Sequence, residues 1–249
     1  MSNERLAKHV SDWIGATIAE SGGVGAVLGL SGGIDSAVAA ALCKRAFPSH
    51  TLGIIMPCES DPADAEDGRL TAQHFGLAQA TVDLTETYRS LCAQLHECFA
   101  DEPGDRLTGA NIKPRLRMTA LYAFANHLGY RVVGTGNRSE LAIGYFTKWG
   151  DGGVDLLPLG SLTKTRVREL GRYLGVPPHI IDKPPSAGLW SGQTDEGEMG
   201  VTYDELDACL EGRGGQAARE TVERLGAAAR HKRELPPVAP LPPGEGDPA

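Results

Sequence analysis

The sequence predicts an α/β protein with an open parallel sheet of about five strands, helices on both faces of the sheet, and further helices at the C-terminal end. Short apolar runs alternate along the chain with longer segments whose apolar residues recur at helical spacing. Strands that alternate with helices in this way form βαβ units, whose strands are parallel. A chain of 249 residues is also long enough to bury a large core.

The individual elements follow from local signals. The apolar runs predict strands at 24–30, 51–56, 80–84, 132–134 and 154–159. Helical spacing predicts helices at 3–20, 35–46, 61–75, 88–99, 115–129, 164–174, 203–210 and 217–231, and Asp, Gly and Pro favour a loop at 101–109. Pro, Gly and Ala dominate the sequence after Glu234. We therefore expect a single domain over 1–235 and a flexible tail over 236–249.

Composition excludes several classes of protein. The net charge of −8 argues against a nucleic-acid-binding surface, which requires a basic excess. Charged residues are spread through the first twenty positions, and no apolar run reaches 18 residues, so we expect neither a signal peptide nor a membrane span, and a cytoplasmic location. The five cysteines include no C-x-x-C pair, which argues against a disulfide framework and a zinc site.

The segment Gly29–Ser36 combines the end of a predicted strand, a Gly-rich loop and the start of a predicted helix. Gly32 and Gly33 permit backbone conformations in which successive N–H groups point at one anion at a helix N-terminus, as in phosphate-binding loops. A P-loop would carry Lys here, whereas this loop carries Asp35. A carboxylate beside phosphate implies a bridging divalent cation such as Mg²⁺. The alternative is a strand–helix turn that binds nothing.

A second candidate loop, Gly134–Glu140, follows the predicted strand at 132–134. Carboxyl ends of parallel strands meet at one edge of a sheet, so this loop is expected to face the first one. Thr135 offers a hydroxyl group, and Glu140 offers a second carboxylate for the cation. Alternatively, Ser139 and Glu140 begin a helix as its cap and first-turn acid.

The loop Ser31–Ser36 resembles the Ser-Gly-Gly-x-Asp-Ser loop of the ATP pyrophosphatases, which cleave ATP between its α and β phosphates. Further matches are specific to one branch of that superfamily, the NAD synthetases. These are Gly-Thr-Gly-Asn-x-Ser-Glu, Thr-Lys-x-Gly-Asp-Gly-Gly-x-Asp, Lys-Thr-x-Val-Arg, Lys-x-Pro-Ser-Ala and His-Lys-Arg, found at 134–140, 147–155, 164–168, 183–187 and 231–233. On this basis the chain resembles an ammonia-dependent NAD synthetase.

The resemblance implies a role for each matching residue. ATP would be bound by Gly29, Leu30, Ser31, Gly32, Gly33, Ile34, Asp35, Ser36, Thr135, Lys164 and Ser186. Asp35 and Glu140 would hold Mg²⁺, and nicotinic acid adenine dinucleotide (deamido-NAD) would be bound by Arg115, Lys148, Asp155, His231 and Lys232. Two simpler interpretations remain: Arg115 and Arg117 could form a solvated helix face, and 231–233 could complement a helix C-terminus.

The resemblance also implies the reaction, the last step of NAD biosynthesis. The nicotinate carboxylate attacks the α-phosphorus of ATP, pyrophosphate leaves, and ammonia converts the resulting nicotinyl-adenylate to NAD⁺ and AMP. Lys164 and Mg²⁺ on Asp35 and Glu140 would stabilise charge, without a covalent nucleophile. A homodimer is implied, and Tyr145, Phe146 and Trp149 are candidates for contacting the nicotinate ring. The rival functions are tRNA thiolation, which would require catalytic cysteines and a basic face, and a nucleotide-binding regulatory module without turnover.

Overall fold

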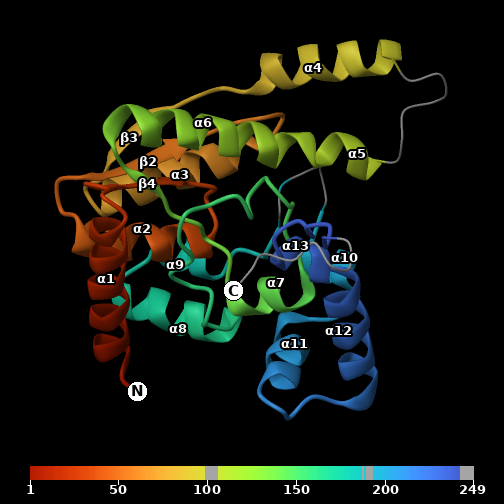
Figure 1. Cartoon of the computed structure of the whole chain (residues 1–249). Coiled ribbons are helices and arrows are strands. Elements are labelled where there is room, and N and C mark those ends of the chain that lie inside the picture. The colour runs from red at the N-terminus through yellow and green to blue at the C-terminus, as the bar shows by residue number, and fades with distance from the viewer. Residues whose placement is uncertain (99–105, 187, 189–192, 242–249) are drawn as a thin grey trace.

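The computed structural model describes residues 1–98, 106–186, 188 and 193–241, and confirms the α/β class (Figure 1). All of the paired strands in its central sheet are parallel. The strands are β1 (Ala26–Gly29), β2 (Thr51–Ile55), β3 (Ala78–Thr81) and β4 (Arg131–Val132), in the spatial order β3-β2-β1-β4. The chain builds outward from β1 to β3 and then returns to the other side of β1. Such a reversal opens a crevice at the carboxyl ends of β1 and β4.

The strand expected at 154–159 forms only an isolated parallel bridge, between Val133 and Leu156. Asp155 changes the hydrogen-bond pattern, because its Oδ2 accepts the backbone N–H of Val132 at 2.7 Å in place of a backbone carbonyl. Pro158 then lacks the N–H that a continuing ladder needs. The described sheet therefore has four strands, and the polar interruption that prevents a fifth is visible in the sequence itself.

One face of the sheet is covered by α1 (Asn3–Glu20), α2 (Ile34–Ala46), α3 (Pro62–His74), α8 (Lys164–Leu174) and α9 (Pro178–Ile181). Ile14, Val38 and Val167 from three of these helices are fully buried in a core that includes Leu28 of β1. The small residues of α2 allow its neighbours to pack closely, and Gly171 of α8 lies directly against Val38. This packing fixes the position of the loop that precedes α2.

The opposite face carries α6 (Ile112–Leu128), against which α4 (Thr85–Cys98) packs, and α5 (Arg106–Ala110) leads into α6 (Figure 1). Several boundaries differ from expectation, among them that of β3, which spans 78–81 instead of 80–84. α4 and α6 each begin three residues earlier than predicted, and α5 occupies part of the expected loop at 101–109, of which 101–105 lie outside the described residues. Helix boundaries are the least certain part of a prediction from sequence.

A C-terminal group of helices packs beside the sheet: α7 (Arg138–Ile143), α10 (Asp195–Met199), α11 (Tyr203–Leu210), α12 (Gln216–Ala228) and α13 (Arg230–Arg233). Its core contains Ile143, Met199 and Leu206. The helix expected at 217–231 is divided at Ala229, whose side chain packs against Gly144.

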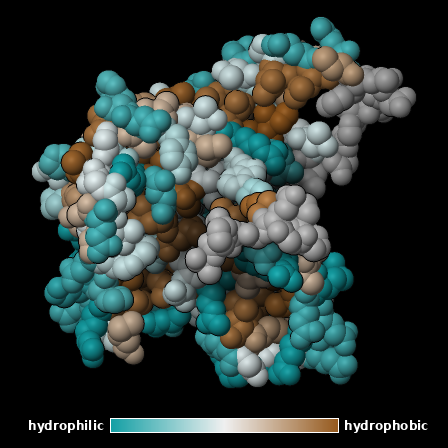
Figure 2. Space-filling model, in the orientation of Figure 1, coloured by the Kyte–Doolittle hydropathy of each residue, from teal (hydrophilic) through white to brown (hydrophobic). Residues whose placement is uncertain are grey.

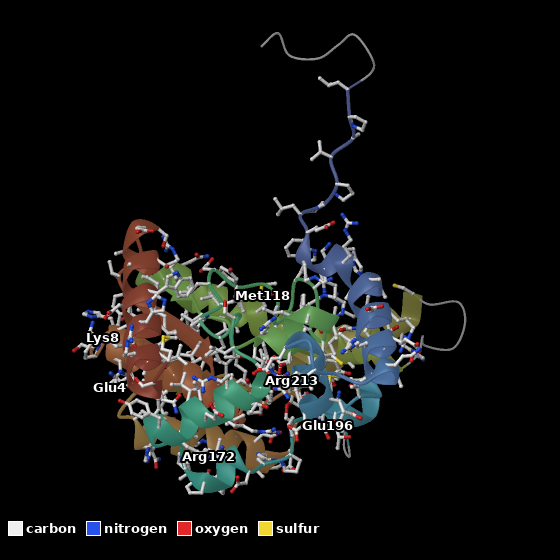
Figure 3. All side chains as sticks on the ribbon, turned by 90° about the horizontal axis from the view of Figure 1, so that it is seen from below. Glu4, Lys8, Met118, Arg172, Glu196 and Arg213 are labelled. Carbon is white, nitrogen blue, oxygen red and sulfur yellow. The ribbon has the colours of Figure 1, made fainter. Side chains whose placement is uncertain are left out.

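Beyond α13 the chain extends away from the other elements, with Leu235 and Val238 largely exposed (Figure 3). Residues 242–249 of the expected tail lie outside the described part of the chain. Within the described residues, none of the helices is both long and apolar enough to cross a membrane.

Candidate active site

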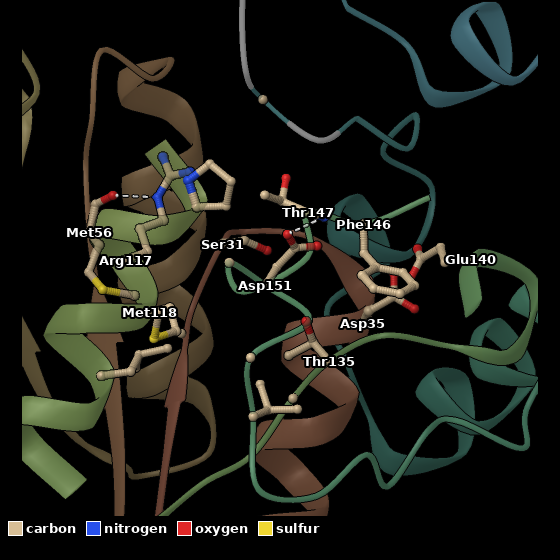
Figure 4. A pocket seen from close by; sticks show the side chains of 18 of the residues that line it. Ser31, Asp35, Met56, Arg117, Met118, Thr135, Glu140, Phe146, Thr147 and Asp151 are labelled. Carbon is tan, nitrogen blue, oxygen red and sulfur yellow. Dashed lines mark hydrogen bonds between the residues drawn. The ribbon is translucent and has the colours of Figure 1, made fainter. Parts of the chain in front are cut away.

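A cavity of about 420 Å³ opens at the carboxyl ends of β1 and β4 (Figure 4). Both loops singled out in the sequence contribute to its wall, as do parts of α6 and the segment 144–154. The predicted site residues that line the cavity are Gly29, Leu30, Ser31, Asp35, Thr135, Glu140, Ser186 and Lys232. Residues separated by about 200 positions in the sequence thus meet around one space, as the strand-end argument predicts.

The loop after β1 is held in shape by its own side chains. Gly32 has a φ of +79°, and a Cβ atom there would lie 2.4 Å from the carbonyl oxygen of Asp64. Ser36 Oγ donates a hydrogen bond to Gly33 O at 2.9 Å and accepts one from the Ser31 N–H at 3.2 Å. No side chain caps α2 among the described residues, and its first turn faces this loop. N–H groups at a helix N-terminus that no side chain caps are suited to binding an anion.

A compact group of charges lies beside the loop. The ammonium of Lys164 contacts Asp35 Oδ2 and lies 3.5 Å from Glu140 Oε1. The Lys164 side chain is 3% exposed, and the two carboxylates are 16% and 17% exposed. Asn137 is fully buried and orients Asp35 by donating from Nδ2 to Asp35 Oδ1 at 2.9 Å. Two carboxylates at one end of the cavity therefore share one buried cation.

The surroundings shift the pKa values of this group. Burial first, and the neighbouring Asp35 second, raise the pKa of Glu140 to about 8, although Lys164 opposes them. Burial alone would lower the pKa of Lys164, but the carboxylates of Asp35 and Glu140 outweigh it and the pKa is raised. Lys164 is consequently a permanent cation at physiological pH.

The interpretation of Glu140 as a first-turn acid is confirmed and is compatible with a site role, but the cap is Asn137, and Ser139 lies inside the helix. Glu140 Oε2 accepts the backbone N–H of Asn137 at 3.1 Å, while Asn137 Oδ1 accepts that of Glu140 at 3.1 Å, a reciprocal capping box at the start of α7. The other oxygen, Oε1, faces Lys164. The cap thereby fixes the direction of the carboxylate.

Sequence reasoning missed Tyr203, which completes this group. Its hydroxyl lies 3.3 Å from Glu140 Oε1 and 2.9 Å from Asp195 Oδ2, and Lys164 Nζ lies 4.8 Å from the centre of its ring. Burial, followed by the surrounding carboxylates, raises the pKa of Tyr203, so its hydroxyl stays neutral and donates. The capping pattern Thr202-x-x-Glu205 signals the start of α11, but no local pattern signals a tyrosine that reaches another element.

Arg117 and Asp151 also line the cavity and were not predicted as site residues (Figure 4). The Arg117 guanidinium donates to Met56 O at 3.1 Å and Ser60 Oγ at 2.9 Å, and forms no ion pair within the described chain. Asp151 accepts the Thr147 N–H at 2.8 Å. The solvated-face interpretation of Arg115 and Arg117 thus holds for exposed Arg115 and is wrong for Arg117, because helical spacing turns their side chains in different directions.

Three of the basic residues assigned to the dinucleotide, Arg115, Lys148 and His231, form a connected group outside this cavity. Arg115 Nη2 donates to Lys148 O at 3.2 Å, and Lys148 Nζ donates to His231 O. Lys148 and His231 line a second cavity of about 450 Å³ against the end of α12 and the start of the tail. Lys232 reaches the first cavity and donates to Gly144 O and Phe146 O, both at 2.8 Å.

The remaining assigned residues lie elsewhere. Asp155 is exposed, accepts the Tyr122 hydroxyl at 3.0 Å and lines neither of these cavities. Ile34 is buried in the core below the phosphate loop. The helix-terminus interpretation of 231–233 is confirmed for Arg233, whose Nη1 donates to Leu141 O and Ala142 O near the end of α7.

Comparison with known proteins agrees with this geometry. A family model described as NAD synthase matches residues 6–236. The NH(3)-dependent NAD(+) synthetase of Carboxydothermus hydrogenoformans is 53% identical over 239 residues, which cover 96% of this chain and 98% of that protein. The corresponding protein of Archaeoglobus fulgidus is 44% identical, with coverage of 96% and 98%.

Solved structures give the same result. An NMN synthetase from Francisella tularensis superimposes with a TM-score of 0.90 at 38% identity, covering 96% of this chain and 99% of that one. An NH3-dependent NAD synthetase from Campylobacter jejuni superimposes with a TM-score of 0.79 at 27% identity, covering 96% and 100%. The sequence matches, the superposed structures and the charged cavity at the ends of β1 and β4 together establish that this chain belongs to the NAD synthase family.

Proposed function

We propose that this chain is an ammonia-dependent ligase that converts deamido-NAD to NAD⁺ while cleaving ATP to AMP and pyrophosphate, the last step of NAD biosynthesis. The observation that carries the proposal is the contact of Lys164 with both Asp35 and Glu140 beside the loop Ser31–Ser36. A buried cation, two carboxylates and a helix N-terminus around one cavity suit a polyphosphate and its metal. Family membership supports the same reaction.

ATP would be bound with its phosphates on the first loop. The backbone from Gly29 to Ser36 would hold the β and γ phosphates that leave together as pyrophosphate, and Lys164 would neutralise charge that develops on them. Thr135 and Ser186 offer hydroxyl groups on two other sides of the same cavity. Both can donate to a nucleotide that spans it.

The residues present are suitable for Mg²⁺. This ion usually takes one or two carboxylates from the protein and completes its shell with substrate phosphates and water. Asp35 and Glu140 supply two carboxylates, and no group of three or more potential metal ligands occurs in the described part of the chain. Bound there, Mg²⁺ would supply positive charge to the reacting phosphates.

The reaction has two steps. A carboxylate oxygen of the nicotinate attacks the α-phosphorus, the bond from that phosphorus to the bridging oxygen breaks, and pyrophosphate leaves. The nitrogen of ammonia then attacks the carbonyl carbon of the nicotinyl-adenylate, AMP departs with its electron pair, and the new amide loses one proton. Lys164 and the amides of the first loop would stabilise the departing phosphates.

The nicotinate ring would contact Phe146, one of three aromatic candidates. Phe146 lines the cavity, and Figure 4 shows it at the same end as Asp35 and Glu140. Tyr145 is held by hydrogen bonds to Asp195 and Glu198, and Trp149 is 51% exposed. Arg115, Lys148, Asp155, His231 and Lys232 would bind the rest of the dinucleotide, whose phosphates need dispersed cations.

Nicotinic acid mononucleotide, the deamidated form of NMN, is a second candidate acceptor. The observation that favours it is the TM-score of 0.90 to a protein named as an NMN synthetase. Nicotinic acid mononucleotide carries the same carboxylate and lacks the adenylate half, so amidation at the same cavity would proceed by the same steps. The ratio of kcat/KM for the two acceptors decides which is preferred.

We further propose that the chain is a cytoplasmic homodimer, with the second copy covering α4 and α6. None of the fourteen residues of α4 is buried, although Leu91 and Leu95 share one of its faces. Apolar side chains gather between α4 and α6 in Figure 2, and α6 carries the partly buried Leu116 and Phe124. An apolar helix face of this kind is typical of an interface between subunits.

The proposed function is tested with purified protein, ATP, Mg²⁺, deamido-NAD and ammonium chloride. NAD⁺, AMP and pyrophosphate should form in equal amounts, and omission of ammonium should abolish NAD⁺. Formation of ADP and phosphate, or of AMP without NAD⁺ in the presence of ammonium, would exclude this ligase reaction.

A further inference from the structure

Asp207 of α11 is a buried carboxylate without a cation. Asp207 is 4% exposed, and its carboxylate forms no ion pair with Lys, Arg or His within the described residues. Two hydrogen bonds satisfy it instead: Ser139 Oγ donates to Oδ1, and the Thr165 N–H donates to Oδ2 at 2.9 Å. Burying an ionised group is costly unless it is well bonded, so these contacts are strong constraints on both donors.

Both donors belong to the segments that carry the charged side chains of the cavity. Ser139 immediately precedes Glu140, and its Oγ also accepts the Lys164 N–H at 3.0 Å. Lys164 and Thr165 are the first two residues of α8, and their N–H groups have no partner within the helix. Ser139 accepts the first of these N–H groups and Asp207 accepts the second. One carboxylate thus ties the residue that precedes Glu140 to the residue that follows Lys164.

The same face of α11 contacts the far ends of these side chains. Tyr203 lies four residues before Asp207, which places both on one face of the helix. The Tyr203 hydroxyl reaches Glu140, and its ring lies under the Lys164 ammonium. α11 packs against α7 and α8 and so contacts both side chains at their backbone and at their tips (Figure 1).

We propose that Asp207 is a positioning residue of the adenylation step. Through the Ser139 hydroxyl and the first amides of α8, it fixes Lys164 and Glu140 relative to Asp35 and the phosphate loop. This inference rests on the proposed function of those three charged groups. It assigns a specific role in the first chemical step to a helix that contributes no side chain to the phosphate loop.

The test is the isosteric substitution Asp207→Asn, because Asn replaces one of the two acceptor oxygens by an NH₂ donor and cannot accept at both positions. Small misplacements of catalytic groups cost up to about a hundredfold in rate, so kcat should fall about tenfold to a hundredfold. KM for deamido-NAD should stay within about twofold, because its proposed ligands lie elsewhere. Hydrogen exchange of the Thr165 amide should become faster, which is a readout independent of turnover.

Ser139→Ala and the double variant test the link. If Asp207 acts through Ser139, the double variant should be no slower than Asp207→Asn alone, because residues of one network are not additive. Ser139→Ala also serves if Asp207→Asn fails to fold. Thr202→Ala is the matched control. Thr202 Oγ1 caps the same helix by accepting the Glu205 N–H at 3.2 Å. Loss of this cap should lower Tm and leave kcat unchanged.

Three results would overturn the inference: kcat of Asp207→Asn within about twofold of the unsubstituted protein, multiplicative effects of Asp207 and Ser139, or an equal loss of kcat in Thr202→Ala. Lys164→Met and Glu140→Gln separate this failure from failure of the proposed function. If both retain full activity, the charged group itself is misassigned. If both lose activity while Asp207→Asn behaves like Thr202→Ala, the charged group is correct and Asp207 has a structural role only.

Discussion

Lys164 Nζ lies 3.5 Å from Glu140 Oε1, although the two residues lie in the first turns of two different helices. Glu140 is fixed by the capping box of α7, and Lys164 is the first residue of α8 after its Thr163 cap. Each helix start therefore supplies one charge, and the rigid caps determine their separation. The arrangement makes the backbone of two helix N-termini part of the site.

Substitution of Lys164 by Met should lower kcat by about 10²- to 10³-fold, because a buried positive charge beside developing phosphate charge is lost. KM for deamido-NAD should change little. Steady-state kinetics with each substrate varied in turn measure both quantities.

Lys8→Met is the control for this substitution. Lys8 forms an exposed ion pair with Asp12 on α1, and exposed pairs contribute little. Its kcat should equal that of the unsubstituted protein. An equal loss in both variants would show that the effect of Lys164→Met is not specific to the cavity.

Gly32→Ala should abolish ATP binding. The residue has a φ of +79°, and the added Cβ would collide with the Asp64 carbonyl oxygen at 2.4 Å. The loop must therefore move, and the converging amides are displaced. Isothermal titration with ATP and Mg²⁺ measures the loss.

Gly76→Ala separates backbone strain from loop displacement. Gly76 has a φ of +62°, and a Cβ there meets nothing within 4 Å. It should lose about 1 kcal/mol of stability from the left-handed conformation alone. Because Gly76 does not line the cavity, ATP should bind as before. Retention of ATP binding by Gly32→Ala as well would refute the phosphate-loop assignment.

Cys43 should resist alkylation in the folded protein. Burial raises the pKa of its thiol to about 12, so the reactive thiolate is scarce near neutral pH. Exposed Cys98 should react with iodoacetamide at about pH 8, and mass spectrometry of the folded protein distinguishes the two sites. Modification of Cys43 at the rate of Cys98 would contradict the packing of α2.

The same shift makes a prediction about stability. The pKa of Cys43 is higher in the folded than in the unfolded chain, so the folded state retains the proton as pH rises above 9. This contribution to the free energy of unfolding should decline by up to about 1.4 kcal/mol per pH unit from pH 9 to 12. Denaturant unfolding across that range, compared with Cys43→Ala, isolates it.

Leu91→Glu with Leu95→Glu should convert the proposed dimer to monomers, since two charges would replace the apolar face of α4. Ala93→Glu adds a charge at an exposed position of the same helix and should leave the dimer intact. Light scattering after size-exclusion chromatography gives the mass of each. A monomeric unsubstituted protein would exclude the dimer directly.

Much of the site was predictable because its parts follow strands. The loops after β1 and β4 carry local signals, namely Gly-Gly with Asp35 and Gly-Thr-Gly with Glu140, and parallel topology brings them together. The place of Glu140 in the first turn of a helix was predictable as well, although the cap is Asn137 instead of Ser139. Periodicity correctly gave the bounds of α8 and α11.

The contribution of α11 could not be predicted. Tyr203 and Asp207 reach Glu140, Ser139 and Thr165 across more than 40 positions of sequence, and only the packing of the C-terminal helices brings them there. The strand at 154–159 failed for a different reason: its apolar character was correct, but Asp155 and Pro158 interrupt the ladder.

Transfer of ¹⁸O from the acceptor to AMP tests the central claim most directly. Deamido-NAD labelled with ¹⁸O in its nicotinate carboxylate is incubated with ATP, Mg²⁺, ammonium and the protein. Attack of the carboxylate on the α-phosphorus predicts one ¹⁸O atom in each AMP and none in pyrophosphate. AMP without ¹⁸O, or the label in inorganic phosphate, would contradict activation of the acceptor as an adenylate in this cavity.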